Sequence, residues 1–133
     1  MMTKSIQYLN PRPLAKPNGF SHLTTLDSIA FISGQVAYDE NGTIVGEGDL
    51  TKQTRQVLTN LQHALAEVGS DFSHVLKMNF YVRDISEAAV AQIREVRKDF
   101  LIESALPAST MVGVAGLAKE TLLLEVEVYA LIP

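Results

Sequence analysis

The chain has 133 residues, 47% hydrophobic and 20% charged, a composition that can bury a core and is unlike that of disordered proteins. Its formal net charge of −4 gives no overall electrostatic attraction to nucleic acid. Because the chain has no cysteine, disulfides, thiolate nucleophiles and cysteine-based metal sites are excluded. We expect a single domain over residues 1–133.

The beginning of the chain, MMTKSIQYLN, lacks the apolar core of a signal peptide, and no apolar run approaches membrane-spanning length. We therefore expect a cytoplasmic protein without membrane contact. The three histidines lack HxxxH or HxH spacing, so no metal site is predicted. Arg94, Arg97 and Lys98 form the densest basic patch, which we interpret as the solvated face of a helix rather than a nucleic-acid site.

The first third of the chain predicts an arm, a strand and a hairpin. Residues 10–19 carry three prolines and are interpreted as an ordered arm without regular structure. The apolar run IAFIS at 29–33 predicts a short strand. The Asn-Gly pair within 39–42 favours a tight reversal, so 36–38 and 43–45 should pair as a hairpin.

The middle of the chain predicts two helices around a strand. From Asp49, apolar residues recur at three- and four-residue spacing, which predicts a helix with Asp49 as its N-cap and Gly69 just beyond its end. Residues 74–82 predict a strand. The sequence DISE at 84–87 resembles a capping box with Asp in place of Ser or Thr and opens a second helix, which must end before Pro107.

Two strands close the chain, at 107–114 and 121–132, and we expect them to form a hairpin. The predicted order is strand, strand, helix, strand, helix, strand, strand, which makes an α+β sheet with both helices on one face. The last strand is apolar on both faces, and no helix remains for the second one. We therefore expect this face to be buried in a homo-oligomer, with Glu125 and Glu127 side by side on it.

These two carboxylates have two interpretations. In a partly apolar crevice a carboxylate has a raised pKa and can exchange a proton near neutral pH, and two together could act as acid and base. Alternatively, each one pairs with a Lys or Arg of a neighbouring copy or points outward at a rim. Periodicity alone favours the second interpretation, more strongly for Glu127 than for Glu125.

Three other segments could contribute to a site. Ser33-Gly34-Gln35 ends a strand with a glycine that lets a ligand approach the backbone, or is a simple bulge. Pro107-Ala108-Ser109-Thr110 offers two hydroxyls at a strand start, or only turn chemistry. His22 could act as a general acid or base, although a lone histidine beside apolar residues is more often structural. No serine has readable partners for a hydrolase triad.

Five segments together resemble the YjgF/RidA/L-PSP (Rid) family: FISGQVAYDENG (31–42), QTRQVLTNLQHALAEVG (53–69), VLKMNFYVRDISE (75–87), LPAST (106–110) and LEVEVYA (124–130). The resemblance covers nearly the whole chain from about Phe20 onward. It implies a chorismate-mutase-like fold, with two helices packed on one face of a mixed sheet, assembled as a homotrimer with ligand clefts between subunits. It also implies that no cofactor or metal is needed.

The best-known members of this family hydrolyse reactive imines and enamines to 2-keto acids and ammonia, so the resemblance implies a deaminase. Its implied mechanism has an arginine that clamps the substrate carboxylate and a glutamate that positions water, and Glu125 matches that glutamate. The resemblance, with the hydroxyls and the histidine above, gives a candidate binding set: Phe20, His22, Ser33, Gly34, Gln92, Ser109, Thr110 and Met111. Phe20 stands where the deaminases usually have a tyrosine.

The family's arginine directly follows Pro-Ala, and here that position is Ser109. Losing a bidentate arginine–carboxylate pair costs several kcal/mol, whereas a serine donates one hydrogen bond worth about 1 kcal/mol. We therefore expect a neutral or cationic substrate rather than a simple amino-acid-derived imine. Helix periodicity leaves open whether Arg94 or Arg97 reaches the site.

Two alternatives to the deaminase remain at this point. One is a trimer that binds a small ligand or protects other proteins without catalysis. The other is an endoribonuclease, an activity reported for some members of the family. The acidic charge and the lack of basic, aromatic-rich segments argue against the ribonuclease.

Overall fold

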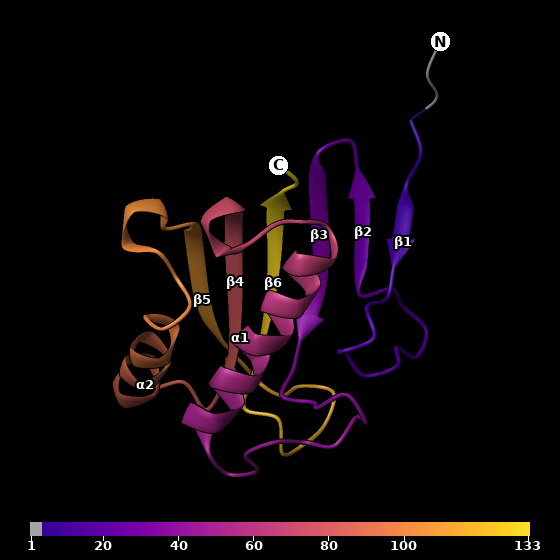
Figure 1. The fold of residues 1–133 in the computed structure, drawn as a ribbon. Helices are drawn as coiled ribbons and strands as arrows, with labels where there is room; N and C mark the ends of the chain where they lie inside the picture. The colour runs from indigo at the N-terminus through magenta and orange to yellow at the C-terminus, as the bar shows by residue number, and fades with distance from the viewer. Residues whose placement is uncertain (1–3) are drawn as a thin grey trace.

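The computed structural model describes residues 4–133, so residues 1–3 of the predicted domain lie outside it. Its strands are β1 (Gln7–Leu9), β2 (Leu23–Leu26), β3 (Ile29–Gln35), β4 (Val75–Arg83), β5 (Ala108–Val114) and β6 (Leu124–Leu131). Its helices are α1 (Leu50–Glu67) and α2 (Glu87–Arg97), with short 3-10 turns at Phe72–His74 and Glu103–Ala105. Figure 1 shows one mixed sheet with order β1-β2-β3-β6-β4-β5.

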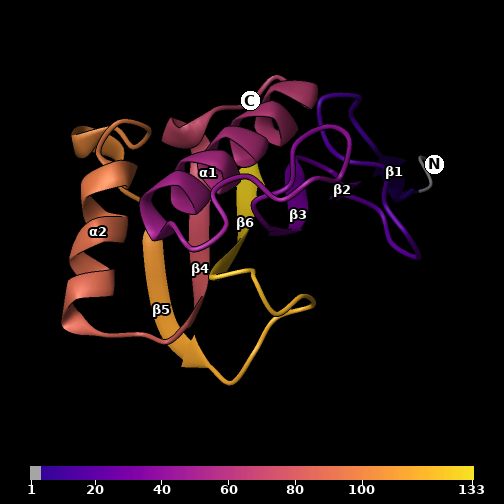
Figure 2. The same ribbon diagram turned by 90° about the horizontal axis from the view of Figure 1, so that it is seen from below.

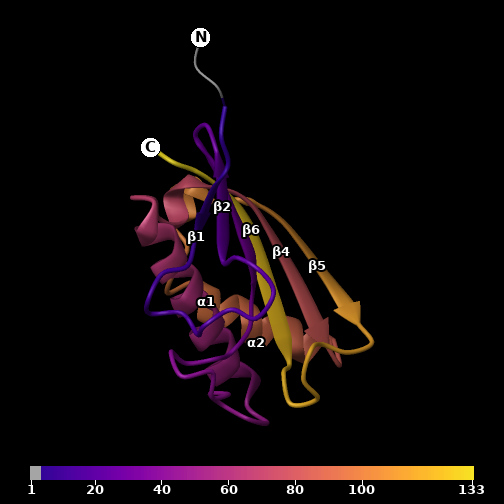
Figure 3. The ribbon, with the colours of Figure 1, turned by 90° about the vertical axis from the view of Figure 1, so that its right-hand side faces the viewer.

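Both helices lie on the same side of the sheet, as Figure 2 and Figure 3 show. This arrangement confirms the predicted α+β class with two helices on one face. The helices cover the inward side chains of the strands, which form the core with the apolar faces of α1 and α2. We call the other sheet face, which no helix of this chain covers, the open face. No helix within 4–133 is long and apolar enough to cross a membrane.

The predicted hairpin between the last two strands is wrong. β5 pairs in parallel with β4, whereas β6 inserts between β3 and β4 and is antiparallel to both. A parallel pair needs a crossover connection, and α2 supplies it between β4 and β5. The crossover places β5 at the sheet edge, and the following loop returns the chain to the centre of the sheet.

The start of the chain contains two strands that the sequence did not predict. β1 and β2 pair antiparallel, and the proline-rich arm at 10–19 connects them. The expected hairpin after β3 is reduced to one bridge, between Tyr38 and Ile44. Pairing ends there because Gly46 and Gly48, both with positive φ (77° and 75°), turn the chain toward α1.

The predicted ends of α1 are confirmed. The Asp49 carboxylate accepts a hydrogen bond of 3.0 Å from the Lys52 N–H, and Gly69 takes a positive φ of 69°. The Ser70 N–H donates to the Leu65 carbonyl at 2.9 Å, which completes a Schellman ending.

The predicted N-cap of α2 is wrong by two residues. Ser86 is the cap, and its hydroxyl accepts a hydrogen bond of 3.0 Å from the Ala89 N–H. Asp84 has a φ of 56° and belongs to the turn before the helix, so it does not adopt the extended backbone of an N-cap. The helix ends at Arg97, well before Pro107.

Candidate functional site

The two glutamates of β6 lie on the open face, as predicted, and have different surroundings. Glu127 is opposite Asn79 in the register of β4, and its Oε1 accepts hydrogen bonds from Tyr81 Oη (2.6 Å) and Asn79 Nδ2 (3.2 Å). The hydrogen bond to Glu127 is the largest cause that raises the pKa of Tyr81, to about 12. Glu127 therefore braces β6 against β4.

Glu125 lies opposite Tyr81, and its side chain is about half-buried. Among residues 4–133 no side chain forms an ion pair or a hydrogen bond with its carboxylate. Burial raises the pKa of Glu125, and the negative charge of Glu127 raises it further. Of the two carboxylates, Glu125 is the one available for chemistry.

Gly34 forms the wall beside this carboxylate. The pairing of β3 with β6 is irregular between Ile32 and Gln35, so a bulge exposes the backbone there. A Cβ at Gly34 would lie 2.6 Å from the Glu125 carboxyl carbon and would overlap with its Oε1. The sequence left open a bulge or the approach of a ligand to the backbone. The bulge is present, and the group beside Gly34 in this chain is the Glu125 side chain, so the approach of a ligand stays a prediction.

Ser33, Phe20 and His22 lie next to this bulge in the fold. The Ser33 hydroxyl donates to the Ser21 carbonyl at 2.6 Å. His22 is buried, with Nε2 2.7 Å from the Ala15 carbonyl and Nδ1 3.2 Å from the Gln35 side-chain amide. These partners fit a neutral ring that donates through Nε2 and accepts at Nδ1, which favours the structural interpretation. The half-exposed Phe20 ring packs edge-on against His22, with centroids 5.2 Å apart.

The parallel register separates the candidate residues of β5 onto two faces. Thr110 is opposite Asn79 on the open face, where its hydroxyl accepts a hydrogen bond of 2.6 Å from Lys77 Nζ. Ser109 is opposite Met78, a fully buried core residue, and so faces the helix side. Met111 shares that side and packs against the core.

Ser109 lines a cavity of about 480 Å³ between β5, α2 and the segment that joins them. Arg94 and Arg97 of α2 line the same cavity. Gln92 is also on α2, is exposed, and does not line this cavity. Within one chain, the sheet separates Ser109 from Glu125, so these two residues do not share one site.

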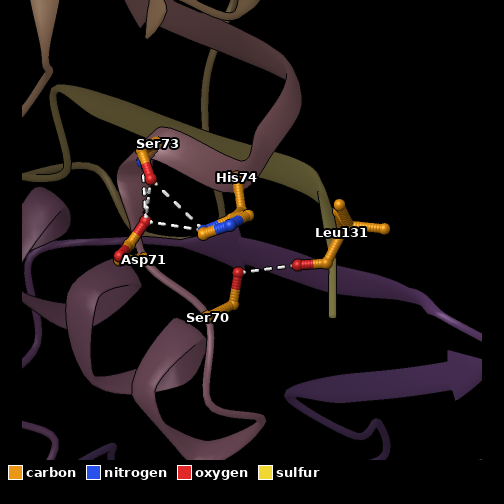
Figure 4. Close-up of polar contacts among 5 residues, drawn as sticks. All are labelled: Ser70, Asp71, Ser73, His74 and Leu131. Carbon is orange, nitrogen blue, oxygen red and sulfur yellow. Dashed lines mark hydrogen bonds and ion pairs between the residues drawn. The ribbon is translucent and has the colours of Figure 1, made fainter. Parts of the chain in front are cut away.

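Apart from the surroundings of Glu125 and the cavity beside Ser109, polar side chains also gather in the turn before β4, where Asp71, Ser73 and His74 contact one another (Figure 4). Asp71 caps the 3-10 turn by accepting from the Ser73 N–H at 2.9 Å, and it also contacts the Ser73 hydroxyl and His74 Nδ1. Ser73 and Asp71 both contact the same nitrogen of His74, so the ring cannot relay a proton between them as a triad does. The hydrogen bonds from Ser73 and His74 lower the pKa of Asp71. This group stabilises a turn.

Comparison with known proteins assigns the family. The profile of the family described as Endoribonuclease L-PSP matches residues 11–132. The chain belongs to the L-PSP family. An L-PSP relative, the "3-aminoacrylate deaminase RutC" of Acinetobacter baylyi, is 33% identical over 116 residues, covering 87% of this chain and 86% of the relative. The "2-iminobutanoate/2-iminopropanoate deaminase" of Dermatophagoides farinae is 27% identical over 111 residues, covering 84% and 82%.

The fold of this L-PSP protein is shared with solved structures. A Rid family protein from Yersinia pestis, YyfA, superposes with a TM-score of 0.88 at 25% identity, over 96% of this chain and all of that one. That neighbour is described as a protein of unknown function. The resemblance to the Rid family that the sequence motifs indicated is thereby confirmed.

Proposed function

We propose that this L-PSP protein hydrolyses a small reactive imine or enamine, with Glu125 positioning the attacking water. The observation that carries the proposal is the Glu125 carboxylate, half-buried against Gly34 and without a hydrogen-bond or ion-pair partner within 4–133. Its neighbour Glu127 is already held by Tyr81 and Asn79. Two relatives whose names describe them as deaminases of such compounds support the same reaction class.

The chemistry requires a base that also returns a proton. The imine carries a proton on nitrogen. Water adds to its carbon while Glu125 takes one of the water protons, which leaves a neutral tetrahedral carbon bearing hydroxyl and amino groups. Glu125 then returns that proton to nitrogen. As the C–N bond breaks and ammonia leaves, Glu125 takes the hydroxyl proton, so that the carbonyl forms, and this last proton passes to ammonia to give ammonium. An enamine first takes a proton on carbon to become the imine. A carboxylate whose pKa is raised by burial suits both roles.

We further propose that the active assembly is a homotrimer with its sites between subunits. Glu125 and Ser109 lie on opposite faces of one sheet, so a ligand can touch both only if they come from different copies. Two features favour such packing: the open face carries the exposed rings of Phe31 and Tyr129, and β5 has a free strand edge.

The test is to generate 2-aminoacrylate in situ and to follow the release of keto acid. We expect the protein to accelerate release, contrary to the expectation drawn from Ser109 alone, because Arg94 and Arg97 line the same cavity as Ser109. Glu125→Gln should lower kcat/KM by about 100-fold or more. Glu127→Gln is the matched control, because it removes the neighbouring carboxylate that braces the strands, and it should keep most of the activity at pH 7.

Three results would contradict this proposal. The first is full activity of Glu125→Gln. The second is saturable binding of a neutral metabolite without any turnover, which would favour a ligand-binding protein. The third is salt-sensitive RNA cleavage that Glu125→Gln abolishes while deamination is absent, which would favour the ribonuclease.

A further inference from the structure

The cavity beside Ser109 combines cationic and apolar walls. Arg94, Arg97 and Lys98 line it, together with one carboxylate, Glu103. Lys98 is already paired with Glu95 at 2.9 Å. The remaining lining is largely apolar, contributed by Met78, Leu101, Leu106 and Pro107. The formal charge of the lining is therefore positive.

The charges of Arg94 and Arg97 are not neutralised by a carboxylate within residues 4–133. Within the described residues neither Arg94 nor Arg97 forms an ion pair, whereas Arg55 on α1 pairs with Asp99 at 2.8 Å. Burial, followed by the charge of Arg94, lowers the pKa of Arg97. The two guanidinium groups line the same cavity and disfavour each other's charge, and an anion bound beside them would offset this repulsion.

Packing holds Arg97 in place for such an anion. Its guanidinium carbon lies 5.7 Å from the centroid of the Phe80 ring, whose side chain is fully buried in the core. A cation held over an aromatic face loses little further freedom when it binds a ligand. Arg94 and Arg97 also line a second hollow of about 370 Å³, which includes Ser109 and Met111 and shares this wall.

We propose that Arg94 and Arg97, with the hydroxyl of Ser109, bind the carboxylate of a small organic acid in this cavity. The planar guanidinium groups match the two oxygens of a carboxylate, and the apolar lining suits a short carbon chain. The inference deepens the proposed function, since it assigns to the substrate a carboxylate and to α2 the arginines that recognise it. The substrate is then anionic, contrary to the expectation drawn from Ser109 alone.

The binding test needs no turnover. The stable product-like acid 2-ketobutyrate is titrated into the protein, with binding followed by calorimetry and amide NMR shifts. We expect Arg97→Met to weaken binding at least 10-fold and Arg94→Met to weaken it less. Arg55→Met is the matched control, since Arg55 also lies over an aromatic ring, 5.8 Å from Phe100, but outside the cavity. It should bind as the wild type does.

Two further probes make the assignment specific. The neutral amide of 2-ketobutyrate should bind weakly and equally to wild type and Arg97→Met. Inorganic phosphate, which has no carbon chain, should bind at least 10-fold more weakly than the acid. If Arg97→Met does not fold, Arg97→Lys keeps the charge but not the paired donors, and we expect intermediate affinity.

The inference is overturned if the double variant of Arg94 and Arg97 binds 2-ketobutyrate as tightly as the wild type. It is also overturned if phosphate binds as tightly as the acid, or if Arg55→Met loses as much affinity. These outcomes are separable from the fate of the proposed function. If carboxylate binding depends on Arg97 but no deamination is seen, this inference is supported and the proposed deaminase activity is contradicted. If deamination is seen but is unaffected by the Arg94 and Arg97 variants, the deaminase activity is supported and this inference is contradicted.

Discussion

At the scale of single residues, the position of the Glu125 carboxylate depends on the absence of a side chain at Gly34. The carboxyl carbon of Glu125 occupies space that a Cβ at Gly34 would need, at 2.6 Å, while the φ of Gly34 is not positive. The glycine is therefore required for space and not for backbone conformation. The missing side chain at this bulge of β3 therefore determines where the Glu125 carboxylate of β6 can lie.

We expect Gly34→Ala to displace the Glu125 side chain with a loss of stability below about 1 kcal/mol, because the added Cβ meets only the end of this flexible side chain, which can move away. Deaminase activity should fall by a larger factor than stability explains. Gly116→Ala is the control, because a Cβ there meets nothing within 4 Å, and its stability should change by less than about 0.5 kcal/mol. Urea unfolding and keto-acid release measure the two effects. Unchanged activity in a folded Gly34→Ala protein would contradict the role given to this contact.

At the scale of secondary-structure elements, the sequence predicted correctly those features that depend on the local spacing of apolar and polar residues. Alternation along β6 placed Glu125 and Glu127 on the open face, and the apolar spacing and Gly69 gave both ends of α1. β1 and β2 were missed because they are three and four residues long, too short for a pattern. The register of β5 was missed because it is set by the crossover through α2 and not by the residues of β5.

The same limits applied to the candidate site. The positions of Glu125 on the open face and of Gly34 at a bulge could be predicted, since each follows from its own strand, whereas their part in a site stays a prediction. The presence of Ser109 and Arg97 in one cavity could not be predicted, because it depends on which face of the edge strand Ser109 occupies. That face is fixed by the parallel register of Ser109 with Met78, a contact between residues 31 positions apart. Helix periodicity could show only that Arg94 and Arg97 lie one turn apart.

The start of α2 gives a test at this scale. Ser86→Ala removes the hydroxyl that accepts from the Ala89 N–H, and we expect a loss of about 1 kcal/mol in the free energy of unfolding. Asp84→Gly should be neutral or slightly stabilising, because glycine adopts the φ of 56° without strain and the lost contact to Arg83 is solvent-exposed on the Asp84 side. Chemical denaturation of both variants checks the assignment. If Asp84→Gly lowers the free energy of unfolding more than Ser86→Ala does, Asp84 rather than Ser86 would be the N-cap of α2.

At the scale of the whole molecule, one sheet carries the two proposed half-sites on opposite faces. The Glu125 half lies on the open face, and the half with Ser109, Arg94 and Arg97 lies under α2 at the β5 edge. In a closed ring of identical copies, each interface joins one surface of a subunit to a different surface of the next. Such a ring can bring the β5 edge of one copy to the open face of its neighbour and complete one site at each interface.

This arrangement predicts complementation between two inactive variants. Glu125→Gln and Arg97→Met should each be nearly inactive alone, because every interface then lacks one of the two groups. When they are co-expressed in equal amounts and assemble at random, half of the subunits keep Glu125 and half of their neighbours keep Arg97. About one quarter of the interfaces, roughly 0.5 × 0.5, should then be intact, and activity should recover to about that fraction of wild type.

The measurement is keto-acid release by mixed oligomers, separated through a tag on one variant and checked for composition by native mass spectrometry. The two variants purified separately and combined without subunit exchange are the control, and they should stay inactive. Mixed oligomers that form but show no recovery would mean that Glu125 and Arg97 do not act at one interface. Because a mixed oligomer carries the intact Glu125 and the intact Arg97 in different subunits, that result would mean that activity needs both groups in one subunit. An Arg97→Met protein that is fully active alone would instead place carboxylate binding under α2 apart from the chemistry at Glu125.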